Sequence, residues 1–171
     1  IPVCVDAAQT AGIFPVFLEE DGIDYVCAAP HKGLYGPMGT GLLITACGSG
    51  LDTILEGGTG TNSLSLSQPE EMPERMESGT VNVPGIAGLR AGLAFVREKG
   101  TDRILRHELE VTRAIYRALR HLDSVELFTG EPDGAAFAPV FSFRVRGFPS
   151  EDTAAALAQQ GVAVRAGLHC A

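Results

Sequence analysis

A single lysine stands in the most turn-prone stretch of the first half of the chain. Lys32 follows His31 and precedes the run GLYGPMGTG, and no other lysine occurs before Lys99. Glycine and proline at this density predict a loop rather than a helix or a strand. In a chain of net charge −8, one isolated lysine is not part of a solvating charge pattern. Lys32 therefore either caps this loop or performs chemistry there.

An acid precedes this lysine in a comparable position. Asp6 ends the apolar run IPVCV, Gln9 follows it, and Lys32 comes soon after a second apolar run, DYVCAA at residues 24–29. Such short runs are typical of buried parallel strands. Ligands of open α/β sheets bind outside the carboxyl ends of the strands. Taken alone, Asp6 could simply cap a helix and Lys32 could form a structural ion pair.

An acid and a lysine at the same sheet edge could also bind a cofactor together. A lysine that can become neutral forms a Schiff base with the aldehyde of pyridoxal phosphate, and an acid keeps the pyridine nitrogen of that cofactor protonated. Burial near other cations lowers the pKa of a lysine readily, whereas an arginine stays charged. The two side chains, with His31 and the mobile glycines beside it, favour this cofactor.

The remaining elements predict an α/β protein with two parts. A third apolar strand is expected at residues 39–46, helices at 84–99 and 102–122, strands within 125–128 and 137–147, a helix at 151–160 that Ser150 caps, and a last strand at 162–165. The Gly- and Ser-rich residues 47–83 predict a long functional or disordered loop. We expect residues 1–97 to be part of a large domain and residues 98–171 to be a smaller, incomplete α+β domain.

Composition narrows the class of protein. The chain has 21 acidic against 13 basic residues, which argues against nucleic acid or an anionic membrane as the main partner. No apolar stretch is long enough to span a bilayer. Cys4 and Cys27 lie in apolar runs, so we expect small buried thiols, no metal site and a reduced, cytoplasmic setting. The sequence begins at Ile1 inside an apolar run, so we expect this chain to be a piece of a longer protein.

Four collinear segments carry a family resemblance. VDAAQTAG, HKGLYGPMGTG, ESGTVNVPGIAGL and VRAGLHCA resemble the signature segments of the class V aminotransferases. Within that family they are similar to the cysteine desulfurases whose active-site cysteine lies in an R-x-G-x-H-C-A segment. The resemblance implies the fold of the fold-type-I pyridoxal-phosphate-dependent transferases.

The resemblance also implies roles for the residues that would hold the cofactor. Asp6 matches the partner of the pyridine nitrogen, and Gln9 matches the side chain that binds the ring hydroxyl. Lys32 matches the Schiff-base lysine, and His31 matches a phosphate ligand. Thr80 matches a threonine that reaches the phosphate of the other subunit's cofactor, which implies a homodimer with shared sites.

Two further roles concern the substrate. Arg165 matches an arginine of the substrate pocket, and Cys170 matches the nucleophile that takes sulfur and holds it as a persulfide. Arg165 and His169 beside this thiol would lower its pKa. The implied reaction converts L-cysteine to L-alanine and passes sulfur to a thiol or an acceptor protein, for iron–sulfur clusters or other thio-cofactors.

Three alternatives share parts of this pattern. A selenocysteine lyase would use the same residues on L-selenocysteine. A class V aminotransferase or epimerase would keep Asp6, Gln9 and Lys32 but would have no need of Cys170. A pseudo-enzyme or interaction domain is favoured only by Ala29, which stands where the family commonly has a hydroxyl residue at the phosphate site; losing such a hydrogen bond costs about 1.5–3 kcal/mol.

Overall fold

The computed structural model describes residues 1–45, 50–61, 64–132 and 137–169. The chain forms two compact units, Ile1–Ile104 and Leu105–Ala171. The boundary between these units lies inside a helix. The functional division that the sequence suggests after residue 97 stays a prediction.

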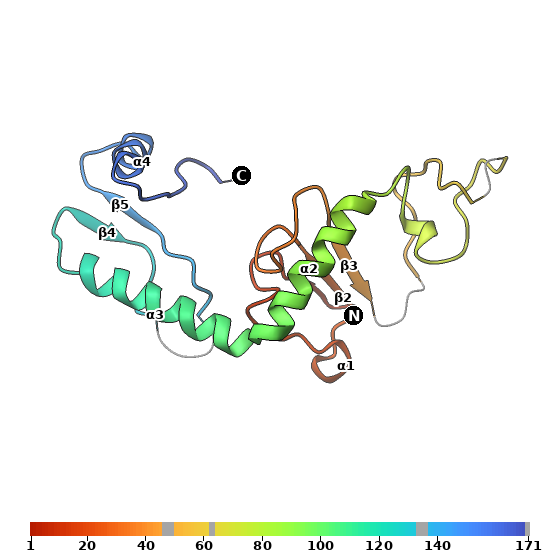
Figure 1. Cartoon of the computed structure of the whole chain (residues 1–171), viewed down its shortest axis with the longest axis horizontal. Helices are drawn as coiled ribbons and strands as arrows, with labels where there is room; N and C mark the ends of the chain where they lie inside the picture. Colours follow the sequence, from red (N-terminus) through yellow and green to blue (C-terminus); the bar gives the residue numbers. More distant parts are fainter. Residues whose placement is uncertain (46–49, 62–63, 133–136, 170–171) are drawn as a thin grey trace. The chain divides into compact units, whose positions relative to one another are not determined.

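A small mixed sheet organises the first unit (Figure 1). Strand β1 (Cys4–Asp6) pairs in parallel with β2 (Tyr25–Ala28), and β2 pairs antiparallel with β3 (Leu42–Thr45), in the order β1-β2-β3. The four-residue helix α1 (Leu18–Asp21) lies in the connection between β1 and β2. All three predicted strands are present, and the reversal of β3 makes the sheet mixed rather than parallel.

Helix α2 (Val83–Lys99) packs against this sheet (Figure 1). The side-chain oxygen of Asn82 accepts a hydrogen bond from the Gly85 amide at 3.0 Å and so caps the helix. Leu89 of α2 is buried with Ala28 of β2 and with Leu34 of the following loop. This contact places the helix over both the sheet and the loop that carries Lys32.

The long segment before α2 has little regular structure, as predicted. Among the residues described between 50 and 82, only the 3₁₀ turn η1 (Glu74–Met76) is regular. Several large apolar side chains of this segment are almost fully exposed, including Ile54 at 95% and Leu66 at 100%. Such side chains need a partner surface to be buried in the functional protein.

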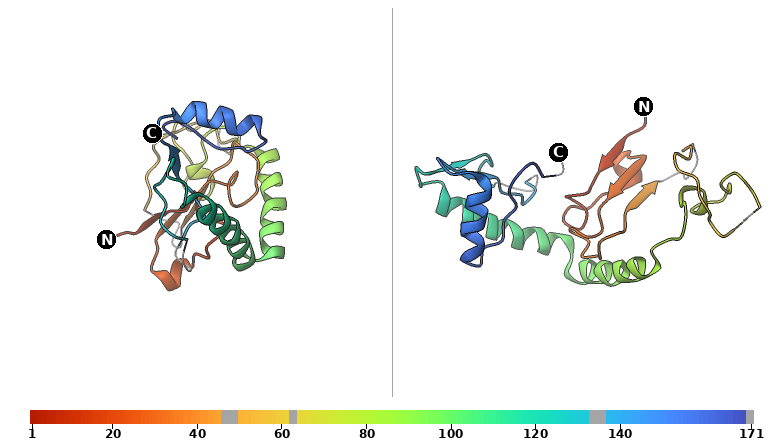
Figure 2. Two further views of the ribbon diagram at one scale, coloured as in Figure 1. Left: turned by 90° about the vertical axis from the view of Figure 1, so that its left-hand side faces the viewer. Right: turned by 90° about the horizontal axis from the view of Figure 1, so that it is seen from above.

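The second unit combines two helices with a two-stranded sheet. Helix α3 (Thr101–Leu119) begins in the first unit, and its residues from Leu105 onward belong to the second unit. Strands β4 (Val125–Leu127) and β5 (Phe143–Val145) pair antiparallel, with Glu126 opposite Arg144. Helix α4 (Ser150–Gln159) contacts β5 (Figure 2). This arrangement agrees with the predicted α+β character of the second half.

Three sequence-based expectations are wrong in detail. Cys4 and Cys27 are exposed rather than buried, because their face of the sheet is opposite the one that holds the buried Val26 and Ala28. Ser150 is the first residue of α4 and makes no capping bond, since Pro149 occupies the N-cap. Residues 162–165 form no strand, because a strand needs a partner edge. In the part of the chain that the structure describes, β5 pairs only with β4 and not with these residues.

Candidate functional site

The parallel pairing of β1 and β2 brings two predicted site segments to the same edge. Asp6 is the last residue of β1 and pairs with Cys27, and β2 ends at Ala28, four residues before Lys32. The Ala7 amide donates to the Cys27 carbonyl at 2.7 Å, so pairing continues past β1. Because parallel strands end at the same side of a sheet, the loops after Asp6 and Ala28 are neighbours.

The loop after Asp6 is a tight turn. Asp6 Oδ1 accepts a hydrogen bond from the Ala8 amide at 2.8 Å. The Thr10 and Ala11 amides both donate to the Ala7 carbonyl, at 3.1 and 2.8 Å. The turn leaves the side chain of Gln9 exposed. Asp6 therefore has one oxygen held by its own backbone turn, which fixes the carboxylate in a set orientation.

The loop that carries Lys32 is held by its backbone. The Lys32 amide donates to the Ala29 carbonyl at 3.1 Å, and the Gly36 amide donates to the Pro30 carbonyl at 2.8 Å. Pro30 is fully buried beneath this loop. The side chains of His31 and Lys32 are exposed. Among the side-chain hydrogen bonds and ion pairs of the described residues, none involves either of them, so both amine and imidazole can meet a ligand.

Two glycines hold these loops together. A Cβ on Gly33 would lie well under 3.0 Å from the Ala11 carbonyl oxygen, and a Cβ on Gly12 would collide in the same way with the Gly33 carbonyl oxygen. Gly12 also has a φ of 88°, which side chains rarely adopt. We call this contact between residues 11–12 and residue 33 the glycine clamp. It sets how far the Lys32 loop lies from the Asp6 loop.

Helix α2 supports the Lys32 loop from its other side. A Cβ on Gly92 would collide with the Leu34 carbonyl oxygen, and a Cβ on Gly88 would lie 2.8 Å from Pro37 Cγ. The Asn82 side chain that caps α2 also donates to the Gly39 carbonyl at 3.1 Å. The sequence reasoning missed both glycine contacts. The only available signal was the spacing of glycines along one face of this helix.

Thr80 lies elsewhere in the first unit. It lines a pocket of about 440 Å³ whose walls come from two parts of the long segment and from Ile86 of α2. That lining contains none of the other predicted cofactor residues. The structure thus brings the loops that carry Asp6, Gln9, His31 and Lys32 to one edge of the sheet, and Thr80 lines a different pocket.

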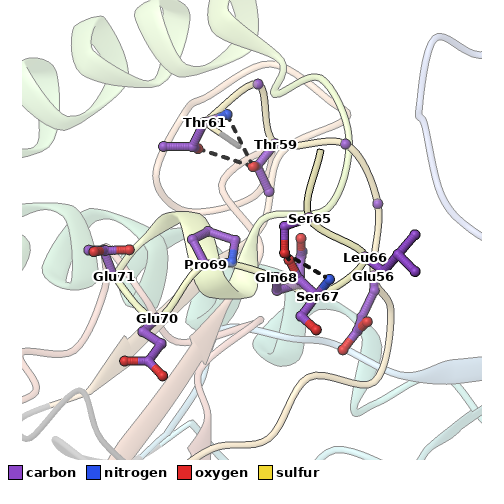
Figure 3. Close-up of a pocket in the computed structure, with 13 residues that line it drawn as sticks. Glu56, Thr59, Thr61, Ser65, Leu66, Ser67, Gln68, Pro69, Glu70 and Glu71 are labelled. Carbon is purple, nitrogen blue, oxygen red and sulfur yellow. Dashed lines mark hydrogen bonds between the residues drawn. The ribbon is translucent and has the colours of Figure 1, made fainter. Parts of the chain in front are cut away.

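A second pocket of the first unit is a less suitable cofactor site. It measures about 830 Å³ and is lined by residues 56–61 and 65–71 (Figure 3). Its walls include the carboxylates of Glu56, Glu70 and Glu71 and no lysine, arginine or histidine. Three carboxylates repel a phosphate group. None of the predicted site residues lines this pocket.

Arg165 belongs to the second unit. With His169 it lines a pocket of about 100 Å³, together with Arg144 of β5 and with Ser150 and Thr153 from the first turn of α4. Both Arg165 and His169 are exposed. The sequence reasoning identified the first two residues and missed Arg144. Cys170, the predicted nucleophile, lies outside the described residues.

The fold itself defines a class of protein. The solved structures described below, which are fold-type-I pyridoxal-phosphate-dependent enzymes, share the α/β arrangement of this chain, and this likeness confirms the predicted fold class. No helix in the described part of the chain is long and apolar enough to cross a membrane.

Comparison with known proteins specifies the family. The family model "Aminotransferase class-V" matches residues 1–171, so the chain belongs to that family. A probable cysteine desulfurase of Methanothermobacter thermautotrophicus is 33% identical over 98% of this chain and 42% of its own length. This chain spans about 40% of the length of the curated relatives it matches.

Solved structures agree with this assignment. The cysteine desulfurase CsdA of Escherichia coli superposes with a TM-score of 0.85 at 27% identity, covering 99% of this chain and 42% of that one. A cysteine desulfurase of Thermococcus onnurineus gives a TM-score of 0.77 at 32% identity, with 99% and 43% covered.

Proposed function

We propose that the protein containing this chain is a pyridoxal-phosphate-dependent cysteine desulfurase that converts L-cysteine to L-alanine and an enzyme persulfide. The observation that carries the proposal is the meeting of the Asp6 and Lys32 loops at one sheet edge, held by the glycine clamp. Membership of the class V family and relatives named cysteine desulfurase support the choice of reaction.

The residues at the edge suit the cofactor. Pyridoxal phosphate, when bound, supplies an aldehyde and a protonated ring that withdraws electrons from the substrate α-carbon. Asp6 is a fixed carboxylate that would hold the proton on the ring nitrogen, and Gln9 would donate to the ring hydroxyl. The exposed imidazole of His31 would contact the phosphate. The methyl group of Ala29 would add no hydrogen bond there.

Lys32 and Cys170 would carry the chemical steps. Lys32 would hold the cofactor covalently and, once the substrate amine displaces it, would act as the base that moves the proton at the substrate α-carbon. The Cys170 thiolate would form a bond to the substrate sulfur while the carbon–sulfur bond breaks. The electron pair of the broken bond returns to the carbon skeleton, which takes up a proton and leaves as L-alanine. Arg165 would orient the substrate.

Further parts of the proposal concern the assembly and its setting. Thr80 is exposed on a segment rich in unburied apolar side chains. This exposure supports a homodimer in which Thr80 reaches the phosphate of the partner's cofactor. Sedimentation of the full protein would test the dimer.

The persulfide would pass its sulfur to a thiol or an acceptor protein for iron–sulfur cluster assembly in the cytoplasm.

The test of the reaction uses the full protein with pyridoxal phosphate, L-cysteine and a reductant. We expect release of sulfide and L-alanine in equal amounts. The Cys170→Ser variant should keep the visible absorbance of the lysine-bound cofactor and lose sulfide release, whereas Lys32→Ala should lose the absorbance as well. Full activity of Cys170→Ser would refute the desulfurase assignment in favour of an aminotransferase or lyase. The same assay with L-selenocysteine tests the choice between sulfur and selenium.

A further inference from the structure

Tyr35 has an unusual backbone conformation for a residue with a large side chain. Its φ is 55°, in the left-handed region, where the Cβ atom of an L-residue lies too close to the carbonyl oxygen that follows it. In the described part of the first unit, every other residue with a positive φ is a glycine. A glycine would adopt this conformation without strain. The tyrosine ring therefore contributes something that a glycine could not.

The ring of Tyr35 packs against Phe95 of α2. The centroids of the two rings are 4.9 Å apart and their planes meet at 65°, an edge-to-face arrangement that aromatic pairs favour. Phe95 lies three residues after Gly92, on the same side of the helix. A Cβ on Gly92 would lie 2.8 Å from the Tyr35 carbonyl oxygen, so the absence of a side chain at Gly92 lets the Tyr35 backbone reach the helix. Helix α2 thus contacts both the backbone and the ring of Tyr35.

Tyr35 in turn holds the backbone of Lys32. The Tyr35 amide donates a hydrogen bond to the Lys32 carbonyl at 3.0 Å. The Lys32 side chain is exposed, and among the described residues no side-chain hydrogen bond or ion pair holds it. The direction of the amine therefore depends on the backbone from which the side chain starts, and Tyr35 supplies one of the hydrogen bonds that fix this backbone.

We propose that Tyr35 is a positioning residue for Lys32. Its edge contact with Phe95 keeps residue 35 in the left-handed conformation, and this conformation fixes the Lys32 backbone so that the amine can meet the aldehyde of pyridoxal phosphate. Tyr35 acts through Lys32, so this inference rests on the proposed function. Strained backbone of this kind persists where the surrounding structure imposes it, and such residues cluster at functional sites.

The experiment separates attachment of the cofactor to Lys32 from binding of the cofactor. The full protein is mixed with saturating pyridoxal phosphate, and the visible absorbance of the lysine-bound cofactor is followed with time. Calorimetry measures the affinity for pyridoxamine phosphate, which has an amine in place of the aldehyde and cannot become attached to a lysine. Tyr35→Gly and Phe95→Leu should attach pyridoxal phosphate about tenfold to a hundredfold more slowly. Both should keep the affinity of the unsubstituted protein for pyridoxamine phosphate.

Two further variants serve as controls. Tyr35→Phe keeps the ring and should attach the cofactor at the rate of the unsubstituted protein. Phe17→Leu replaces another partly exposed phenylalanine of the first unit and should also leave the rate unchanged. The original rate in Tyr35→Gly would overturn the inference. An equal loss of pyridoxamine phosphate affinity would also overturn it, because the whole site would then be damaged. Slow attachment in Tyr35→Phe would assign the effect to the hydroxyl group and refute the role of the ring contact.

The proposed function can fail separately. If the unsubstituted protein attaches the cofactor to another lysine, or to none, the role of Lys32 is refuted and the positioning role of Tyr35 with it. If the unsubstituted protein attaches the cofactor to Lys32 and the variants do so at the same rate, only the role of Tyr35 is refuted. Mass spectrometry of the borohydride-reduced protein identifies the modified lysine in each case.

Discussion

Replacing Gly33 by alanine tests whether the glycine clamp positions the candidate site. The new Cβ would collide with the Ala11 carbonyl oxygen and would lie 3.6 Å from Ile13 Cγ1. Gly33 does not have a positive φ, so the cost is steric alone. Overpacking costs about 1–3 kcal/mol, and we expect about 3 kcal/mol because the obstacle is backbone rather than a flexible side chain.

The displaced loop should also bind the cofactor less well. If the Lys32 loop moves away from Asp6 to relieve the collision, a loss of about 1.4 kcal/mol or more corresponds to at least tenfold weaker pyridoxal phosphate binding. Denaturant unfolding measures the stability of the full protein, and absorbance titration measures the cofactor affinity. Both should change in Gly33→Ala.

A matched control comes from the same loop. Gly41 has no positive φ and no atom near its added Cβ, so Gly41→Ala should change stability by less than about 1 kcal/mol. Equal stability and cofactor affinity in the Gly33→Ala and Gly41→Ala variants would refute the positioning role of the clamp.

Substitutions at three further positions test other parts of the structure. Gly12→Ala should destabilise the protein more than Gly33→Ala, because it adds the strain of a φ of 88°, about 1–2 kcal/mol, to a similar collision; equal denaturation midpoints would contradict this. Asn82→Ala should cost about 1–2 kcal/mol through loss of the helix cap and of the bond to the Gly39 carbonyl, whereas Asn82→Asp should recover the cap alone. Burial raises the pKa of Glu108 above its ordinary value of 4.5, so the folded state binds this proton more tightly and the free energy of unfolding should fall as the pH rises from 4.5 through the raised pKa. Glu108→Gln should remove this part of the pH dependence in urea unfolding, and an unchanged profile would count against it.

The residues at the ends of the strands could be predicted from the sequence. Short apolar runs before Asp6 and before the Lys32 loop predicted β1 and β2, and the rule for parallel strands placed both ends at one edge. Helix α2 was equally clear, from Pro84 near its start and Gly100 after its end. These features depend on local chemistry, which a sequence displays directly.

Features that depend on tertiary contacts could not be predicted from the sequence. The exposure of Cys4 and Cys27 follows from which face of the sheet α2 covers, and an apolar run does not reveal this. The role of Gly33 depends on the backbone of Ala11, twenty-two residues earlier. Residues 162–165 have the composition of a strand, but a strand also needs a partner edge.

Reductive trapping tests most directly whether Lys32 carries the cofactor beside Asp6. The full protein is loaded with pyridoxal phosphate, reduced with borohydride and digested, and the modified lysine is identified by mass spectrometry. We expect the reduced cofactor to be attached to Lys32, and an Asp6→Ala variant to retain much less of it. Attachment at another lysine in place of Lys32, or undiminished retention in Asp6→Ala, would contradict the proposed roles of these two residues.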